Sequence, residues 1–209
     1  MPVLAASGLA CRRGDRLLFE GLDFALQPGQ IVWVRGRNGQ GKTSLLRLLA
    51  GLSTPAAGAI TWGGVPLRAA GAAFEQRLVY LAHANALKED LTVLESLQFL
   101  LRLHGREVSH AALEDALRRL NLHSRRGAPV RTLSQGQRRR VALARLLVEP
   151  AASLWVLDEP YDALDAEGSA VLDAVLSSHA QRGGSVVLTS HLALAVVWPA
   201  PVVLELGAA

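Results

Sequence analysis

The chain has 209 residues, of which 50% are hydrophobic, a size that fits one domain or one domain with an inserted lobe. It has no stretch of about 18 uninterrupted apolar residues, which excludes a membrane-spanning helix, and no charged-then-apolar leader, so we expect no secretion signal. The single cysteine, Cys11, excludes an internal disulfide and favours a reducing compartment such as the cytoplasm.

The first section of the chain is rich in predicted strands. Residues 3 to 27 alternate in polarity and turn at Gly14-Asp15 and Pro28-Gly29, which predicts a small antiparallel sheet. A second strand pair is predicted on either side of Gly63-Gly64.

A glycine-rich turn follows the strand predicted over residues 31 to 34 and precedes a helix predicted over residues 44 to 50. The turn matches the phosphate-binding loop pattern, in which backbone N–H groups surround the phosphates of a nucleoside triphosphate. In this pattern Lys42 reaches the β and γ phosphates, and the Thr43 hydroxyl holds magnesium. The predicted nucleotide-binding residues are Gly36, Arg37, Asn38, Gly39, Gln40, Gly41, Lys42, Thr43 and Ser44.

The period of the apolar residues changes to a helical one after residue 91. Thr92 and Glu95 form a possible capping box for a helix ending at Gly105, and a second helix is predicted from Ser109 to Asn121. We interpret residues of about 88 to 147 as a helical subdomain inserted in the α/β core of one domain spanning residues 1 to 209.

Arginines dominate the charge of this helical section. The net charge is +4, and Lys42 and Lys88 are the only lysines, whereas arginines recur from Arg102 to Arg145. Such a stripe indicates nucleic acid, an anionic membrane surface or solvated helix faces. We favour solvated faces, because no aromatic residues alternate with the arginines as they do in single-strand binding platforms.

A short motif opens the arginine-rich helix predicted near residues 136 to 147. Ser134, Gln135 and Gly136 follow a turn, and the free N–H groups of a helix start can bind an anion. Taken alone, the motif is only a good helix cap.

An apolar strand of residues 154 to 157 ends in Asp158 and Glu159, which a core strand tolerates only at an exposed carboxyl end. There Asp158 can hold magnesium, directly or through water, and Glu159 can orient or deprotonate an attacking water. Helices near 136 to 147 and 166 to 179 alternate with strands 153 to 157 and 185 to 189, which favours parallel strands with helical crossovers. Residues 192 to 206 are interpreted as a short helix followed by a strand.

Together these motifs resemble the ATP-binding cassette (ABC) family, and the resemblance covers almost the whole chain. It implies a P-loop NTPase fold of ABC type, with a mostly parallel core sheet, an antiparallel β subdomain and an inserted helical subdomain. Five motifs follow one another in the family's order. They are the phosphate loop of residues 36 to 43, the signature motif of residues 133 to 137, the magnesium strand ending at Glu159, the D-loop of residues 163 to 165 and a switch histidine, His191.

The family implies ATP and Mg²⁺ as ligands, ATP hydrolysis as the activity, and Glu159 and His191 as catalytic residues, with Thr43 and Asp158 holding the metal. It also implies that two cassettes stack head to tail, so that Ser134, Gln135 and Gly136 of one close over the nucleotide of the other. The expected partners are therefore a second copy or a paired cassette, and integral membrane subunits, with no nucleic acid.

Two segments depart from the family pattern. His83 stands where the family usually has a metal-contacting glutamine, after the strand predicted over residues 78 to 82. Cys11, Arg12 and Arg13 stand where an aromatic ring commonly stacks on adenine, and an arginine plane could take that role.

Within the family, the opening segment, His83 and the arginine-rich helix resemble the ATP-binding subunit of the bacterial haem exporter of cytochrome c maturation. This resemblance implies a peripheral protein on the cytoplasmic face of the inner membrane that powers haem export or delivery. Haem need not touch this chain, which has no Cys-x-x-Cys-His motif. The alternatives are a transporter subunit for a drug, lipid or metal complex, and a soluble cassette ATPase acting on nucleic acid or ribosomes.

Overall fold

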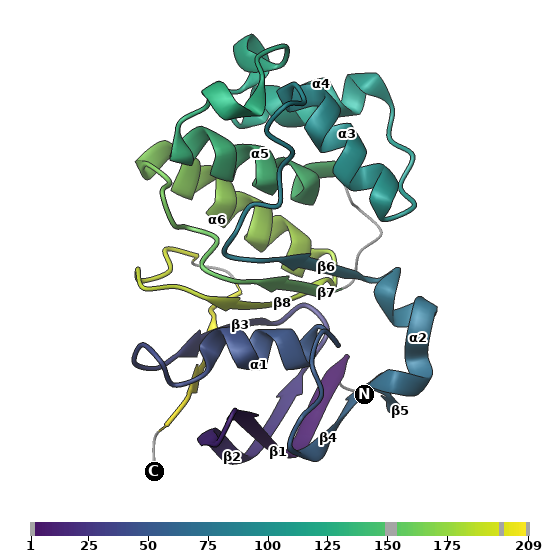
Figure 1. Ribbon diagram of the computed structural model, residues 1–209, viewed down its shortest axis with the longest axis vertical. Coiled ribbons are helices and arrows are strands. Elements are labelled where there is room, and N and C mark those ends of the chain that lie inside the picture. Colours follow the sequence, from purple (N-terminus) through teal and green to yellow (C-terminus); the bar gives the residue numbers. More distant parts are fainter. Residues whose placement is uncertain (1–2, 149–153, 197–198, 208–209) are drawn as a thin grey trace.

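The computed structural model describes residues 3–148, 154–196 and 199–207, which form two sheets and the helices that pack on them (Figure 1). The smaller sheet is antiparallel, with the strand order β2-β1-β4-β5. Its strands are β1 (Leu4–Arg13), β2 (Arg16–Leu26), β4 (Ala57–Trp62) and β5 (Val65–Pro66).

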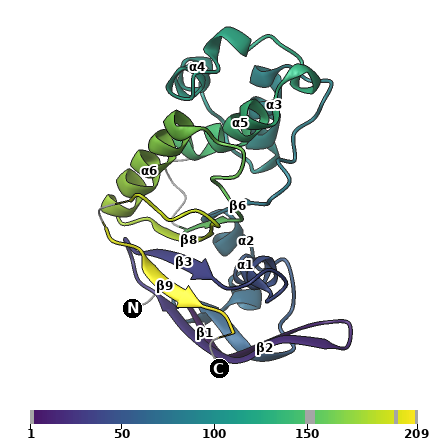
Figure 2. The same cartoon turned by 90° about the vertical axis from the view of Figure 1, so that its left-hand side faces the viewer.

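The larger sheet is parallel, with the order β6-β7-β8-β3-β9. The strand that leads into the phosphate loop, β3, lies between the two last strands of the chain, β8 and β9, so residues far apart in sequence meet at the carboxyl edge of this sheet (Figure 2). Its strands are β3 (Ile31–Arg35), β6 (Leu78–Leu81), β7 (Leu154–Leu157), β8 (Ser185–Thr189) and β9 (Val202–Glu205).

The helices cover the parallel sheet on both faces. Figure 1 shows α1 between the two sheets, and α5 and α6 on the opposite face of the parallel sheet with α3 and α4 beyond them. The helices are α1 (Lys42–Leu49), α2 (Leu67–Glu75), α3 (Val93–Leu103), α4 (His110–Arg119), α5 (Gln135–Val148) and α6 (Ala166–Gln181), with short 3-10 turns at His123–Arg125 and Val130–Thr132. Within the described ranges, no helix is long and apolar enough to cross a membrane.

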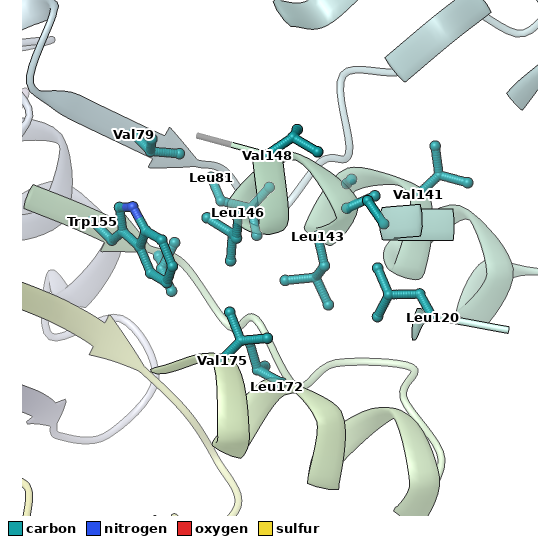
Figure 3. Packing of buried hydrophobic residues seen from close by; sticks show 14 of the residues in the cluster. Val79, Leu81, Leu120, Val141, Leu143, Leu146, Val148, Trp155, Leu172 and Val175 are labelled. Atoms are coloured by element: carbon teal, nitrogen blue, oxygen red, sulfur yellow. The ribbon is translucent and has the colours of Figure 1, made fainter. Parts of the chain in front are cut away.

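The parallel strands separate two apolar cores, because successive side chains of a strand point to opposite faces. On β7, Trp155 and Leu157 face the helical side, whereas Leu154 and Val156 pack toward α1 and the antiparallel sheet. On the helical side, Leu143 and Leu146 of α5 lie between the sheet and α6 (Figure 3). This packing holds α5 and α6 against the helical face of the parallel sheet.

Most of the predicted elements are confirmed. The capping box of Thr92 and Glu95 is present on α3, Ser109 caps α4, and Asn121 adopts the positive φ of 55° typical of a helix stop. The fold class is therefore confirmed in both sheets and in the helices; the boundary of the helical subdomain at residues 88 to 147 stays a prediction.

Two predictions are wrong in part. The strand predicted at the end of residues 192 to 206 is confirmed as β9. The described part of the tail, residues 192 to 196, contains no helix, because the Ser190 hydroxyl bonds to the backbone of Leu192 and offers it a turn instead. The solvated-face interpretation fails for Arg139 and Arg145, whose side chains are buried. The first residue of the strand predicted over 153 to 157 lies outside the described residues.

Candidate nucleotide site

The phosphate loop lies at the carboxyl end of β3 and leads directly into α1. Gly36, Gly39 and Gly41 have φ values of 149°, 81° and 96°, which only glycine adopts without strain. Gly41 caps α1, and a Cβ there would come within 3.1 Å of Leu18 on β2. The glycines thus turn the backbone N–H groups of the loop and the positive end of the α1 dipole toward one point.

The side chain of Lys42 closes this loop. Its Nζ donates to the carbonyl oxygen of Gly36 at 2.8 Å, while the Gln40 side chain accepts from the N–H of Arg37. The Gln40 side chain also stands against Gly207, just beyond β9, so the last strand supports the loop from behind.

The two predicted carboxylates follow β7, two strands away from β3 in the sheet. The Thr189 hydroxyl at the end of β8 donates to Asp158 Oδ1 at 2.9 Å and accepts from the N–H of Glu159 at 2.8 Å. Asp158 is 2% exposed, so the carboxyl end of β7 is more enclosed than we expected from the sequence. Glu159 has a φ of 48°, a strained conformation for a non-glycine residue that is typical of active sites.

His191 covers the Glu159 carboxylate. The backbone N–H of His191 donates to Glu159 Oε2 at 3.0 Å, and the imidazole Nε2 of His191 lies 3.5 Å from Glu159 Oε1. The Glu159 side chain is 14% exposed and that of His191 is 60% exposed, so the imidazole stands between the carboxylate and solvent.

These residues line one cavity of about 440 Å³. It contains the predicted loop residues Asn38, Gly39, Gly41, Lys42, Thr43 and Ser44 together with His83, Asp158, Glu159 and His191. Gly36, Arg37 and Gln40 shape the loop from outside the cavity lining. Four segments of the chain thus converge on one point, as the parallel sheet requires.

Arginines from the β1–β2 hairpin complete the cavity. Arg13, Arg16 and Leu18 line it, and Arg16 Nη2 lies 4.0 Å from where a Cβ on Gly39 would stand. No aromatic residue is found among the described residues that line this cavity. Cys11 is buried beside Ser44, and this burial raises the pKa of its thiol.

The predicted signature residues lie elsewhere. Ser134, Gln135 and Gly136 do not line the cavity, and Ser134 and Gln135 are exposed. The Ser134 hydroxyl accepts from the N–H of Gln137 at 3.2 Å, as an N-cap does. A Cβ on Gly136 would stand 2.6 Å from the Ala163 carbonyl oxygen, so this position requires glycine.

The donor set of the cavity fits a magnesium ion that is bound partly by its substrate. The described residues include no cluster of three or more His, Cys, Asp or Glu side chains that could hold a metal alone. Magnesium usually takes one or two protein oxygens and completes its shell with water and phosphate oxygens. The Thr43 hydroxyl and the Asp158 carboxylate are oxygens of this kind in the same cavity.

A glycine loop between strand and helix, facing two carboxylates at the edge of a parallel sheet, defines a P-loop nucleoside triphosphatase. The family model described as ABC transporter matches residues 19–162. The chain belongs to the ABC transporter ATP-binding proteins and is an ATPase of that family.

Curated relatives share almost the full length of the chain. The cytochrome c biogenesis ATP-binding export protein CcmA of Aromatoleum aromaticum is 49% identical over 99% of this chain and 96% of its own. The CcmA proteins of Methylococcus capsulatus and Pseudomonas putida are 48% and 50% identical, over 92% and 90% of this chain and 93% and 89% of their own.

Solved structures agree on the fold. An ABC transporter ATP-binding protein from Pyrococcus furiosus has a TM-score of 0.83 at 28% identity, covering 97% of this chain and 96% of its own. The ATP-binding subunit of another ABC transporter has a TM-score of 0.79 at 25% identity, covering 91% of this chain and 80% of its own.

Sequence reasoning missed Arg16, Thr189 and Arg139. Arg16 is one of several arginines near the hairpin turn, and Thr189 reads as an ordinary β-branched strand residue. Arg139 stands in a run of three arginines, of which it alone is buried. Only the fold distinguishes these residues from their neighbours.

Proposed function

We propose that this chain hydrolyses ATP to power haem export or delivery for the assembly of c-type cytochromes. The observation that carries the catalytic part is the single cavity in which the phosphate loop meets Asp158, Glu159 and His191. The relatives named cytochrome c biogenesis ATP-binding export protein support the biological setting. A transporter for another cargo is the alternative.

In this proposal the loop N–H groups and Lys42 bind the β and γ phosphates of ATP. Thr43 and Asp158 hold magnesium, which neutralises charge on the phosphates when it is bound. The hydrogen bond from Thr189 fixes the orientation of the Asp158 carboxylate, and this leaves one carboxylate oxygen for the ion.

Glu159 orients the attacking water and accepts its proton. Its carboxylate is largely enclosed, and its backbone is held by Thr189, so the oxygen atoms have little freedom. His191 contacts this carboxylate and, from its exposed position, can reach the γ-phosphate side of the cavity. Catalysis then depends on positioning and charge stabilisation.

The signature residues act on a second cassette. Ser134 and Gln135 are exposed and outside the chain's own cavity, and the free N–H groups of the α5 start can bind a phosphate. We therefore propose that Ser134, Gln135 and Gly136 close over the nucleotide of a second copy or of a paired cassette.

The working position of the chain is the cytoplasmic face of the bacterial inner membrane, bound to integral membrane subunits. Family membership supports such partners. Nucleic acid is not a proposed ligand, since Arg118, Arg131 and Arg138 already pair with Glu114, Asp90 and Glu89. Haem is not bound directly in this proposal, because the sequence has no Cys-x-x-Cys-His motif and its histidines are scattered.

The proposal is tested with Glu159→Gln, which keeps the shape of the side chain and removes its basicity. We expect unchanged ATP affinity by calorimetry and a loss of turnover of about 10²-fold or more in a phosphate-release assay. Turnover near that of the wild type would refute the role of Glu159. Loss of c-type cytochromes on deletion of the gene tests the cargo; intact cytochromes would favour the alternative cargo.

A further inference from the structure

Arg139 is a buried arginine in the first turns of α5, next to the signature motif. Its side chain is 2% exposed, whereas its neighbours Arg138 and Arg140 are partly exposed and pair with acidic residues. A buried guanidinium is costly unless its N–H groups are bonded. Its partners therefore show what this position requires.

One side of the guanidinium holds the catalytic segment after β7. Nη2 donates to the carbonyl oxygens of Asp158 at 2.8 Å and Glu159 at 2.6 Å, and Nε donates to that of Pro160 at 3.3 Å. Three consecutive carbonyl groups are thus fixed by one side chain, at the point where Glu159 adopts its strained φ.

The other side holds the loop after β6. Nη1 lies 3.1 Å from the carbonyl oxygen of Ala82, 3.4 Å from that of His83 and 2.9 Å from Asn85 Oδ1. His83 also lines the nucleotide cavity, so this loop and the catalytic segment approach the nucleotide from adjacent strands.

We propose that Arg139 is a positioning residue for ATP hydrolysis, which locks the catalytic segment and the His83 loop to α5 in one geometry. It does not line the cavity, so it acts through the carbonyl groups that it holds. Because α5 begins at the signature motif, movement of the signature motif is transmitted through Arg139 to the chain's own catalytic carboxylates. This inference rests on the proposed function of Glu159.

The carboxylates around Arg139 partly offset the cost of burying its charge. Burial lowers the pKa of its guanidinium, and the carboxylates of Asp162, Asp158 and Glu159 act in the opposite direction. The phosphate loop is held separately, by the Lys42 and Gln40 side chains and by the glycines between β3 and α1. None of the described hydrogen bonds of Arg139 goes to this loop. Loss of Arg139 therefore affects turnover and leaves nucleotide binding intact.

The test uses two variants of the purified full-length chain, assayed alone and with its membrane subunits in detergent. Arg139→Met removes all donors at similar volume, and Arg139→Lys keeps the charge but cannot reach both loops at once. We expect an unchanged Kd for MgATP by calorimetry in both, and kcat reduced by about 10 to 100-fold in Arg139→Met and less in Arg139→Lys.

Arg145→Met is the matched control. Arg145 is also buried on α5, and its Nη1 donates to the carbonyl oxygen of Tyr80, which lies within β6 and not in the catalytic segment or the His83 loop. We expect Arg145→Met to unfold at lower urea concentration with unchanged kcat per folded molecule. If Arg139→Met does not fold, Arg139→Lys decides the question.

The inference is overturned if Arg139→Lys, and Arg139→Met where it folds, hydrolyse ATP at the wild-type rate. It is also overturned if the activity of these variants decreases only in proportion to the fraction of folded protein, as we expect for the control. A wild-type chain without ATPase activity would instead refute the proposed function. Both results come from the same assay and are therefore distinguishable.

Discussion

The hydroxyl of Thr189 makes the sharpest prediction, because one buried atom supports both catalytic carboxylate residues. Thr189 is 0% exposed, and its Oγ1 lies 2.9 Å from Asp158 Oδ1 and 2.8 Å from the N–H of Glu159. Thr189→Val keeps the shape and removes both bonds. An unsatisfied buried donor or acceptor costs about 1 to 3 kcal/mol, so the two together cost about 2 to 6 kcal/mol in the free energy of unfolding.

Urea unfolding followed by circular dichroism measures this loss, with Thr189→Ser as the matched control because it keeps the hydroxyl. We expect Thr189→Ser to lie within about 1.5 kcal/mol of the wild type, as a small change in a core does. The folded Thr189→Val protein should also need more Mg²⁺ for half-maximal turnover, since Asp158 is no longer oriented. A free energy of unfolding for Thr189→Val within about 0.5 kcal/mol of that of Thr189→Ser would refute this reasoning.

Further predictions concern binding, closure and acid stability. Lys42→Ala should lose ATP binding, which calorimetry measures; unchanged affinity would overturn the loop assignment. Gly136→Ala should lower stability and turnover, because its Cβ meets the Ala163 carbonyl oxygen at 2.6 Å; wild-type values for both would contradict this. His179 stacks on Trp155 with ring centroids 3.6 Å apart, and burial lowers its pKa from 6.5 to about 4. Between pH 6.5 and pH 4, His179 binds a proton in the unfolded chain but not in the folded one. The free energy of unfolding is therefore highest above pH 6.5 and falls by about 3 kcal/mol as the pH decreases to 4. This acid loss should be smaller in His179→Phe, measured by urea unfolding at pH 7 and pH 4.5; equal loss in both proteins would exclude His179 as its source.

The parts of the site that follow from local patterns could be predicted from the sequence. The loop of residues 36 to 43 has a fixed spacing with a strand before it and a helix after it, so its structure is a local property. The carboxylates at the end of β7 follow from the rule that polar residues end a buried parallel strand. The capping box of α3 is local in the same sense.

The parts that depend on tertiary contacts could not be predicted. The burial of Arg139 depends on the β6 loop and the β7 segment meeting beside α5, and these are separated by more than 70 residues. Thr189 acquires its role only because β8 lies next to β7. The absent helix after Ser190 reflects a side-chain bond that competes with the helical backbone, which hydropathy does not record.

The central place of β3 has a consequence for the synthesis of the protein. Both neighbours of β3 come from the end of the chain, β8 and β9, so its backbone has no partner strand until ribosomes have added some 150 further residues. At about 5 to 20 residues per second, that delay is roughly 8 to 30 s. During translation the backbone N–H and C=O groups of this apolar strand stay unpaired. We therefore expect chaperones to bind it and truncated products to aggregate through it.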